Sequence, residues 1–196
     1  MKRLIIAFLT LLCPLLLTAQ IHPITHSLQF DMGCVNYHVN FSDTVKVRGP
    51  GLTVCYAMGV TKHLELLASA SMTRGTDHNW QNGSLVLRQY NTESVELGLR
   101  GHVDFSKKCY AQLSAQAGFM MFHCTDCYEH DYFYTSYRSV LSFNGNAGVG
   151  VRVTPVVAIL AYFKMHGHVG VLIRDNPHYD FSYNELGLSL NFRLED

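Results

Sequence analysis

The densest group of side chains that could do chemistry lies in the stretch HCTDCYEH, residues 123 to 130. It places two thiols and two imidazoles close together, at His123, Cys124, Cys127 and His130. Thiolate and neutral imidazole are the ligands that Zn²⁺ prefers, so a tetrahedral metal site is one interpretation. A zinc finger, however, separates its two ligand pairs by about a dozen residues, and no intervening fold fits here.

We favour a disulfide between Cys124 and Cys127, formed in an oxidising compartment, over the metal site; free thiols are a third interpretation. The mature chain has five cysteines, and an odd number excludes complete pairing within the chain. We expect Cys34, Cys55 and Cys109 to be small buried or membrane-facing residues. Nothing in the sequence leads us to expect a cofactor.

The beginning of the chain predicts export. Lys2 and Arg3 precede an apolar run from Leu4 to Leu17, which ends in the small pair Thr18 and Ala19. This pattern is typical of a secretory signal peptide, here residues 1–19. A spanning helix needs roughly 20 apolar residues, and this run is shorter.

The composition of the remaining residues, 20–196, favours a single domain in a membrane. Without Lys2 and Arg3 the chain has 13 Lys and Arg against 15 Asp and Glu, a formal charge of −2, so no nucleic-acid partner is expected. Charged residues make up 15% of the whole chain, well below the roughly 25% of soluble domains. With no second long apolar run, this low charge indicates a closed sheet in lipid.

Eight segments alternate apolar and polar residues with a period of two, which is typical of strands with one apolar face. In the last of them, YNELGLSLNFRLED, Leu186 and Leu188 fall on one side and Glu185 and Gly187 on the other. The alternation covers residues 28–34, 52–61, 64–73, 94–103, 110–121, 143–153, 157–168 and 183–196. Tight connections (61–63, 105–108, 154–156) alternate with longer ones (40–50, 75–87, 125–141, 170–182). The pattern predicts an all-β fold, an eight-stranded antiparallel transmembrane barrel with short periplasmic turns and longer extracellular loops.

The two faces of these strands differ in a way that predicts which one is inside. The polar face is rich in Gly, Ala, Ser, Thr, Asn and Gln, which fit the narrow interior of an eight-stranded barrel. Its few charges balance, as charges inside a lumen must. We expect a lumen charge network of Asp31, Glu65, Glu96 and Glu185 with Arg100, Arg152, Lys164 and Arg193. The opposite face is almost uncharged, as lipid requires.

On this alternation and turn pattern the chain resembles the small outer-membrane barrel families, of the OmpA transmembrane-domain, OmpX and PorT-like kind. Phe192 and Leu194, near the end of the last strand, are similar to the signal that the outer-membrane insertion machinery reads. The resemblance implies a monomer in the bacterial outer membrane, with periplasmic termini, in contact with lipid and lipopolysaccharide. It implies no particular activity.

The expected role is structural or adhesive, with loops 125–141 and 170–182 presented to an extracellular ligand. These loops and their edges are rich in aromatic residues, which suit either recognition or a membrane-interface girdle: Tyr128, Tyr132, Phe133, Tyr134, Tyr137, Tyr179, Phe181 and Tyr183. One alternative is a barrel enzyme that modifies lipid A or phospholipid, although the chain lacks the His-x-Ser pair expected of such a deacylase. The other is a small gated channel, although side chains mostly fill so narrow a lumen.

Overall fold

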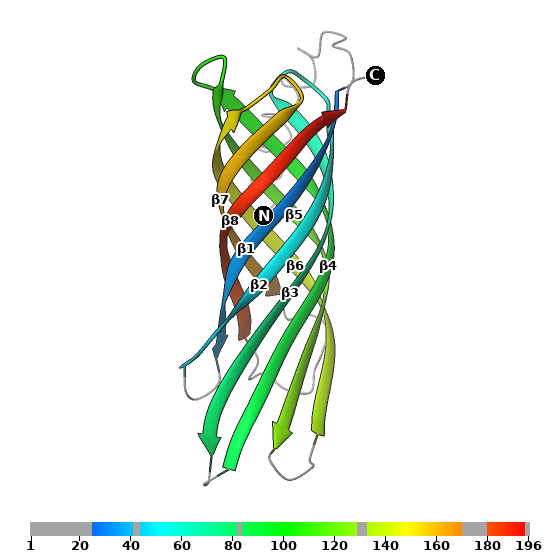
Figure 1. The fold of residues 1–196 in the computed structure, drawn as a ribbon. Coiled ribbons are helices and arrows are strands. Elements are labelled where there is room, and N and C mark those ends of the chain that lie inside the picture. The colour runs from blue at the N-terminus through cyan, green and yellow to red at the C-terminus, as the bar shows by residue number, and fades with distance from the viewer. Residues whose placement is uncertain (1–24, 41–43, 82–83, 129–132, 170–179, 195–196) are drawn as a thin grey trace.

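The computed structural model describes residues 25–40, 44–81, 84–128, 133–169 and 180–194, and they form one closed antiparallel barrel (Figure 1). Each strand pairs with the next, and β1 also pairs with β8, which closes the sheet. The predicted eight-stranded antiparallel fold is therefore confirmed. The strands are β1 (His26–Asn40), β2 (Thr44–Gly59), β3 (Leu64–Gln81), β4 (Ser84–Asp104), β5 (Cys109–Tyr128), β6 (Phe133–Arg152), β7 (Val157–Val169) and β8 (Asp180–Leu194). Nowhere in these ranges does a helix have the length and apolarity to cross a membrane.

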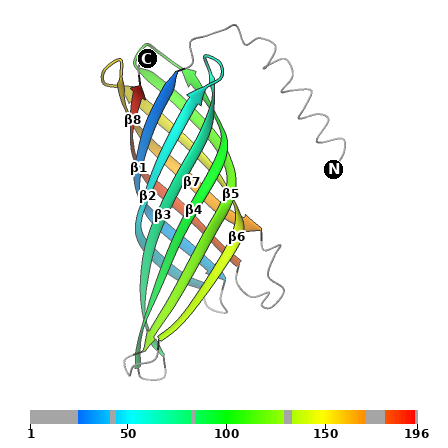
Figure 2. The same ribbon diagram turned by 90° about the vertical axis from the view of Figure 1, so that its right-hand side faces the viewer.

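Three tight turns gather at one end of the barrel, which we call the turn end. They join β2 to β3, β4 to β5 and β6 to β7, and each contains a hydroxyl side chain that accepts backbone N–H groups two and three residues later. These acceptors are Thr61, Ser106 and Thr154, the positions at which such local turns are favoured. The first residue of β1 pairs with the last of β8, so both strands meet the turn end as well (Figure 2).

At the other end the strands differ in length. β4, β5 and β6 have 21, 20 and 20 residues, whereas β7 has 13 and β8 has 15. Figures 1 and 2 show the β3–β4 and β5–β6 hairpins running well past the rest of the wall. We call this projecting part, residues 76–81, 84–89, 123–128 and 133–137, the extension.

The prediction that residues 75–87 and 125–141 form loops is wrong for most of these residues. Most residues of these two predicted loops continue β3, β4, β5 and β6 as the extension. Their register pairs Thr76 with Gln89 and Thr125 with Thr135. Hydrophobic alternation stops where a face no longer needs to be apolar, but the backbone hydrogen-bond ladder does not depend on that pattern. The sequence signal therefore ended before the strands did. Of the predicted loop 170–182, residues 180–182 belong to β8 and 170–179 lie outside the described residues.

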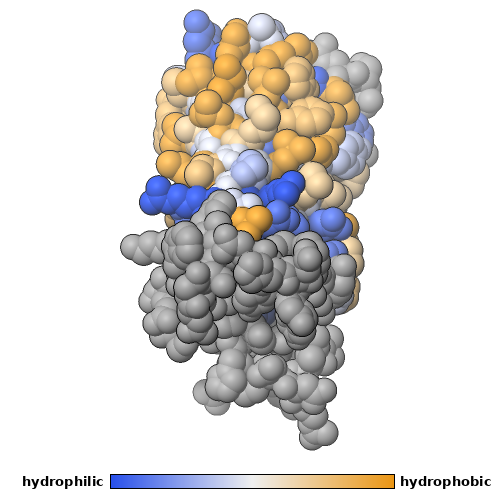
Figure 3. Space-filling view, turned by 60° about the horizontal axis from the view of Figure 1, so that its bottom comes forward, coloured by the Kyte–Doolittle hydropathy of each residue, from blue (hydrophilic) through white to orange (hydrophobic). Residues whose placement is uncertain are grey.

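The outside of the barrel wall is apolar and the inside is polar. Leu97 and Leu113 are each 67% exposed on the outer face, whereas Asp31 and Glu96 are each 2% exposed inside. On the face seen in Figure 3, apolar side chains cover most of the wall as far as a band of hydrophilic ones. Outward-facing charges such as Arg48, Arg74 and Glu93 occur near the level where the extension begins.

Candidate functional site

The lumen is the candidate site, because the buried charged side chains of the described residues gather there. At the turn end, Arg100 projects inward from β4 and is 2% exposed. Its guanidinium donates to the carboxylate of Glu65, to the side-chain oxygen of Gln29 and, over 3.2 Å, to the hydroxyl of Ser27. One buried cation thus links β4 to β3 and, across the lumen, to β1.

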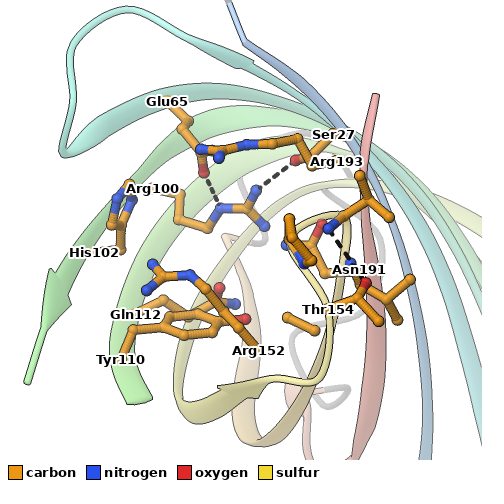
Figure 4. A pocket seen from close by; sticks show the side chains of 14 residues that line it. Ser27, Glu65, Arg100, His102, Tyr110, Gln112, Arg152, Thr154, Asn191 and Arg193 are labelled. Carbon is orange, nitrogen blue, oxygen red and sulfur yellow. Dashed lines mark hydrogen bonds and ion pairs between the residues drawn. The ribbon is translucent and has the colours of Figure 1, made fainter. Parts of the chain in front are cut away.

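Around Arg100 the lumen opens into a small cavity of about 80 Å³, which we call the mouth (Figure 4). Arg152, Arg193 and Tyr110 are among its lining residues. Arg152 lies 2.5 Å from the carboxylate of Asp104, and its guanidinium carbon lies 5.0 Å from the centre of the Tyr110 ring. The hydrogen bond from Arg152 holds the pKa of Asp104, beside the β4–β5 turn, below its usual range.

Deeper in the lumen, one lysine holds two carboxylates. The ammonium of Lys164 lies 3.3 Å from Glu185 and 3.8 Å from Asp31, and it donates to the hydroxyl of Thr53 over 2.8 Å. Gln29 donates to Asp31 over 2.7 Å. These partners come from β1, β2, β7 and β8, so the cluster joins the strands on both sides of the barrel closure.

Glycines in the wall make room for this cluster. Tyr162 donates from its hydroxyl to Glu185, and both side chains lie against the facing pair Gly33 and Gly187. A Cβ on Gly33 would lie 2.7 Å from the Glu185 carboxylate, and one on Gly187 would lie 2.2 Å from the carbonyl oxygen of Met32. No Cβ fits at either position without displacing its neighbours.

Above Lys164, Glu96 has no arginine or lysine partner within ion-pair distance among the described residues. It accepts hydrogen bonds from Ser142, over 2.8 Å, and from Asn144, and His166 lies 3.2 Å away. A serine, a carboxylate and a histidine meet here, but Ser142 is 0%, Glu96 2% and His166 3% exposed. A lipid on the outer face cannot reach them, so these three residues give no support to the lipid-modifying alternative.

A layer of aromatic and aliphatic side chains closes the lumen towards the extension. Tyr37, Tyr90 and Tyr183 are each at most 1% exposed, and the Tyr37 ring centre lies 6.1 Å from Tyr90 and 5.6 Å from Tyr183. The layer is completed by Val35, Val47, Met120 and Phe122. Below it, the cavity beside Lys164 has only about 10 Å³. At this level of the described barrel, buried side chains therefore take up most of the lumen.

Tyr183 is a correction, because its position beside the predicted loop 170–182 suggested a surface or girdle role. It lies in β8 with its ring inside the lumen, 4.5 Å from the His166 ring. Tyr37 and Tyr90 were not singled out by the sequence at all. Both residues fall on the inward-facing side of the alternation in their strands. That alternation is the signal that could have identified them.

The residues of the predicted charge network fall into separate groups. Asp31, Glu185 and Lys164 meet, and Glu65 meets Arg100. Glu96 sits instead among polar donors and His166, and Arg152 pairs with Asp104, which the sequence did not single out. Arg193 is exposed at the mouth.

The cysteines divide between the faces of the wall. Cys34 is exposed and Cys55 buried, so the two lie on opposite faces, and both are free, as is Cys109. Cys124 and Cys127 lie in β5, and their side chains and His130 are outside the described residues. Residues three apart in a continuous strand are roughly 10 Å apart at Cα, whereas a disulfide spans about 4.4–6.8 Å. The Cys124–Cys127 bridge, which stays a prediction, requires β5 to break there.

No metal site emerges from the part of the chain that the structure describes, where no three His, Cys, Asp or Glu side chains are grouped to hold an ion. His123 belongs to that part and lies in β5. The proposed ligand set His123, Cys124, Cys127 and His130 stays a prediction, because three of the four side chains lie outside it.

Comparison with known proteins finds relatives by structure alone. No protein-family model and no curated protein sequence matches the chain. Neisserial surface protein A matches with a TM-score of 0.59 and 13% identity, over 88% of this chain and 100% of its own. A major outer membrane protein of Thermus thermophilus matches with a TM-score of 0.57 and 9% identity, over 88% of this chain and 100% of its own.

The attachment invasion locus protein Ail of Yersinia pestis, solved in complex with the heparin analogue sucrose octasulfate, matches with a TM-score of 0.53 and 15% identity. The match covers 85% of this chain and 99% of Ail. At these identities the likeness is one of fold. The chain therefore has the architecture of the small outer-membrane β-barrels, with a lumen that its own side chains fill.

Proposed function

We propose that this protein is a plugged outer-membrane barrel whose role is structural and adhesive. The observation that carries the proposal is the inverted wall, with exposed leucines, valines and phenylalanines outside and charged side chains buried inside. Such a wall is stable when hydrocarbon surrounds it, since lipid accepts apolar side chains and the lumen satisfies the polar ones.

The different connections at the two ends of the barrel support the orientation that we propose. Outer-membrane barrels place short turns in the periplasm and longer connections outside the cell. The turn end, where β1 begins and β8 finishes, is accordingly periplasmic, and the extension stands outside. Export through the signal peptide, assembly by the insertion machinery and contact with lipopolysaccharide belong to the same proposal.

The extension is the part suited to recognition. Its described strand residues are paired out to Gln81 with Ser84 and to Cys127 with Phe133, so these paired strands form an ordered platform that loses little freedom when a partner binds. The β5–β6 hairpin is the aromatic one in sequence, and aromatic side chains give large contact areas. That the fold can serve attachment is consistent with Ail, whose name states an attachment role. The buried side chains inside the lumen favour display over passage in this proposal.

The first test concerns the membrane. Mature protein refolded into detergent or lipid is expected to migrate differently on gels before and after boiling, as folded outer-membrane barrels do. Correct folding in plain buffer, without any amphiphile, would exclude the proposed location, because the apolar outer face of the wall would then be stable in water.

The second test concerns adhesion and uses the register of β5 and β6. Removing residues 124–136 and joining the paired residues His123 and Tyr137 through an Asn-Gly turn shortens the hairpin without shifting any pair. The control removes residues 79–86 between the paired His78 and Leu87 of the neighbouring hairpin. Cells with the first variant are expected to lose attachment to host or neighbouring-cell material, and the control to keep it. Equal attachment by all three proteins would refute the adhesive role.

A further inference from the structure

We propose that the mouth of the lumen binds a tetrahedral oxyanion, inorganic phosphate or a soluble phosphate monoester, from the turn-end side. The inference goes beyond the proposed function, because display of the extension needs no ligand at the opposite end. Figure 4 shows the residues concerned around the cavity.

The charge of the mouth favours an anion. Three guanidinium groups line it, from Arg100, Arg152 and Arg193, against one carboxylate, that of Glu65. Asp104 neutralises Arg152 from outside the lining. Arg193 is exposed and takes part in no ion pair between described residues. Guanidinium groups are weakly hydrated and match phosphate oxygens, so they are the cations best suited to hold one.

Donors remain available at the mouth after the internal contacts are counted. A guanidinium has five N–H donors, and Arg100 uses three of its own on Glu65, Gln29 and Ser27. The hydroxyl of Tyr110 has no hydrogen-bond partner among the described residues, although this side chain is only 6% exposed. A buried hydroxyl without a partner is costly, and a bound oxyanion would supply the acceptor.

The arrangement of these donors fits a tetrahedral ligand. Arg100, Tyr110, Arg152 and Arg193 come from four different strands, β4, β5, β6 and β8, and so surround the cavity. A planar carboxylate accepts in one plane, whereas phosphate presents oxygens in four directions. The cavity of about 80 Å³ exceeds the share of liquid volume of a single water, about 30 Å³, and accommodates one such ion.

The surroundings indicate a soluble source. The exposed Lys62, Lys107 and Lys108 lie in turns at this end and raise the local concentration of anions. Two of the lining residues, Arg100 and Gln112, face inward and are only 2% and 6% exposed, and Arg193 is exposed at the turn end of the lumen. A phospholipid beside the barrel therefore does not reach Arg100 or Gln112, and we assign the site to solutes that enter from the turn end.

The test is isothermal titration of inorganic phosphate into the refolded mature protein in neutral maltoside micelles. Saturable binding is expected, weaker by about tenfold in Arg193→Gln, which loses a charge-assisted bond, and by about fivefold in Tyr110→Phe, which loses a neutral one. Arg74→Gln, an exposed cation away from the mouth, is the matched control and should leave the affinity unchanged. Heat-modifiable migration confirms that each variant is folded.

Absence of saturable binding by the parent protein, or unchanged affinity in both mouth variants, would overturn the proposal. Acetate is the planar comparator, and equal affinity for acetate would overturn the tetrahedral assignment. A titration in nanodiscs distinguishes the sources: competition by phosphatidylglycerol, but not phosphatidylcholine, would show a lipid headgroup in the site and overturn the soluble source. The variant with the shortened β5–β6 hairpin should still bind phosphate, so failure of the adhesive proposal leaves this one independently testable.

Discussion

Replacing Lys164 by Met removes the cation that two buried carboxylates share. Lys164 is 3% exposed, and Met keeps most of its volume without its charge. At an effective dielectric constant of about 20, unit charges separated by 3.3 and 3.8 Å attract by roughly 4 to 5 kcal/mol each. Part of this attraction offsets the desolvation of the three charges, and one carboxyl can take up a proton in the variant. We therefore expect a loss of about 3–5 kcal/mol in the free energy of unfolding, the range measured for broken buried pairs.

The assay is denaturant unfolding in micelles or vesicles, followed by gel migration and by the fluorescence of the chain's one tryptophan. Lys62→Met, at an exposed turn position, is the matched control, with a change within about 0.5 kcal/mol. Adding Glu185→Gln to Lys164→Met should recover at least about 1 kcal/mol, because Gln still accepts from Tyr162 and one uncompensated charge is gone. A loss below about 1 kcal/mol, or a double variant no more stable than the single one, would refute the role given to Lys164.

Two further predictions concern the wall. Leu188→Lys, at an outer position that is 61% exposed, should lower the free energy of unfolding in lipid by about 2–4 kcal/mol, and Leu194→Lys near the turn end by only about 0–1 kcal/mol; equal losses would count against a surrounding bilayer. Gly187→Val should prevent refolding, as judged by gel migration, because its Cβ would meet the Met32 carbonyl oxygen, whereas Gly167→Ala, with nothing within 4 Å of the added Cβ, should refold; a normally folding Gly187→Val protein would contradict the close wall packing.

The sequence predicted the strands and their faces because one face of each strand meets the apolar surroundings of the barrel and the other meets the polar lumen. This difference produces the alternation with a period of two. The alternation of Leu186 and Leu188 with Glu185 and Gly187 defines the inside and outside of β8 without any knowledge of its neighbours. The three tight turns also predicted which strands form hairpins at one end, since a short connection makes its two strands neighbours.

Contacts across the lumen could not be predicted in the same way. Lys164 of β7 meets Asp31 of β1, and Glu96 of β4 meets Ser142 of β6. Such meetings depend on strand tilt and on the stagger at which the sheet closes, and neither is encoded in the alternation of a single segment. The partner of Arg152 was missed for the same reason. The position of a residue in the alternation of its strand decides whether its side chain enters the lumen. The stagger at which the barrel closes decides how far along the lumen that side chain lies.

The unequal strand lengths give the end opposite the turns a high side and a low side. β3 to β6 rise as a ledge, while β7, β8 and β1 end lower, so the molecule has a front and a back when viewed along its axis. In the proposed orientation, a large partner outside the cell would meet this ledge first, and from one side of the barrel only. In a crowded membrane, neighbouring barrels can cover this ledge or leave it open, according to how each copy is rotated about its axis. The surface available to a partner therefore depends on how the barrels pack side by side as well as on how many copies the membrane holds.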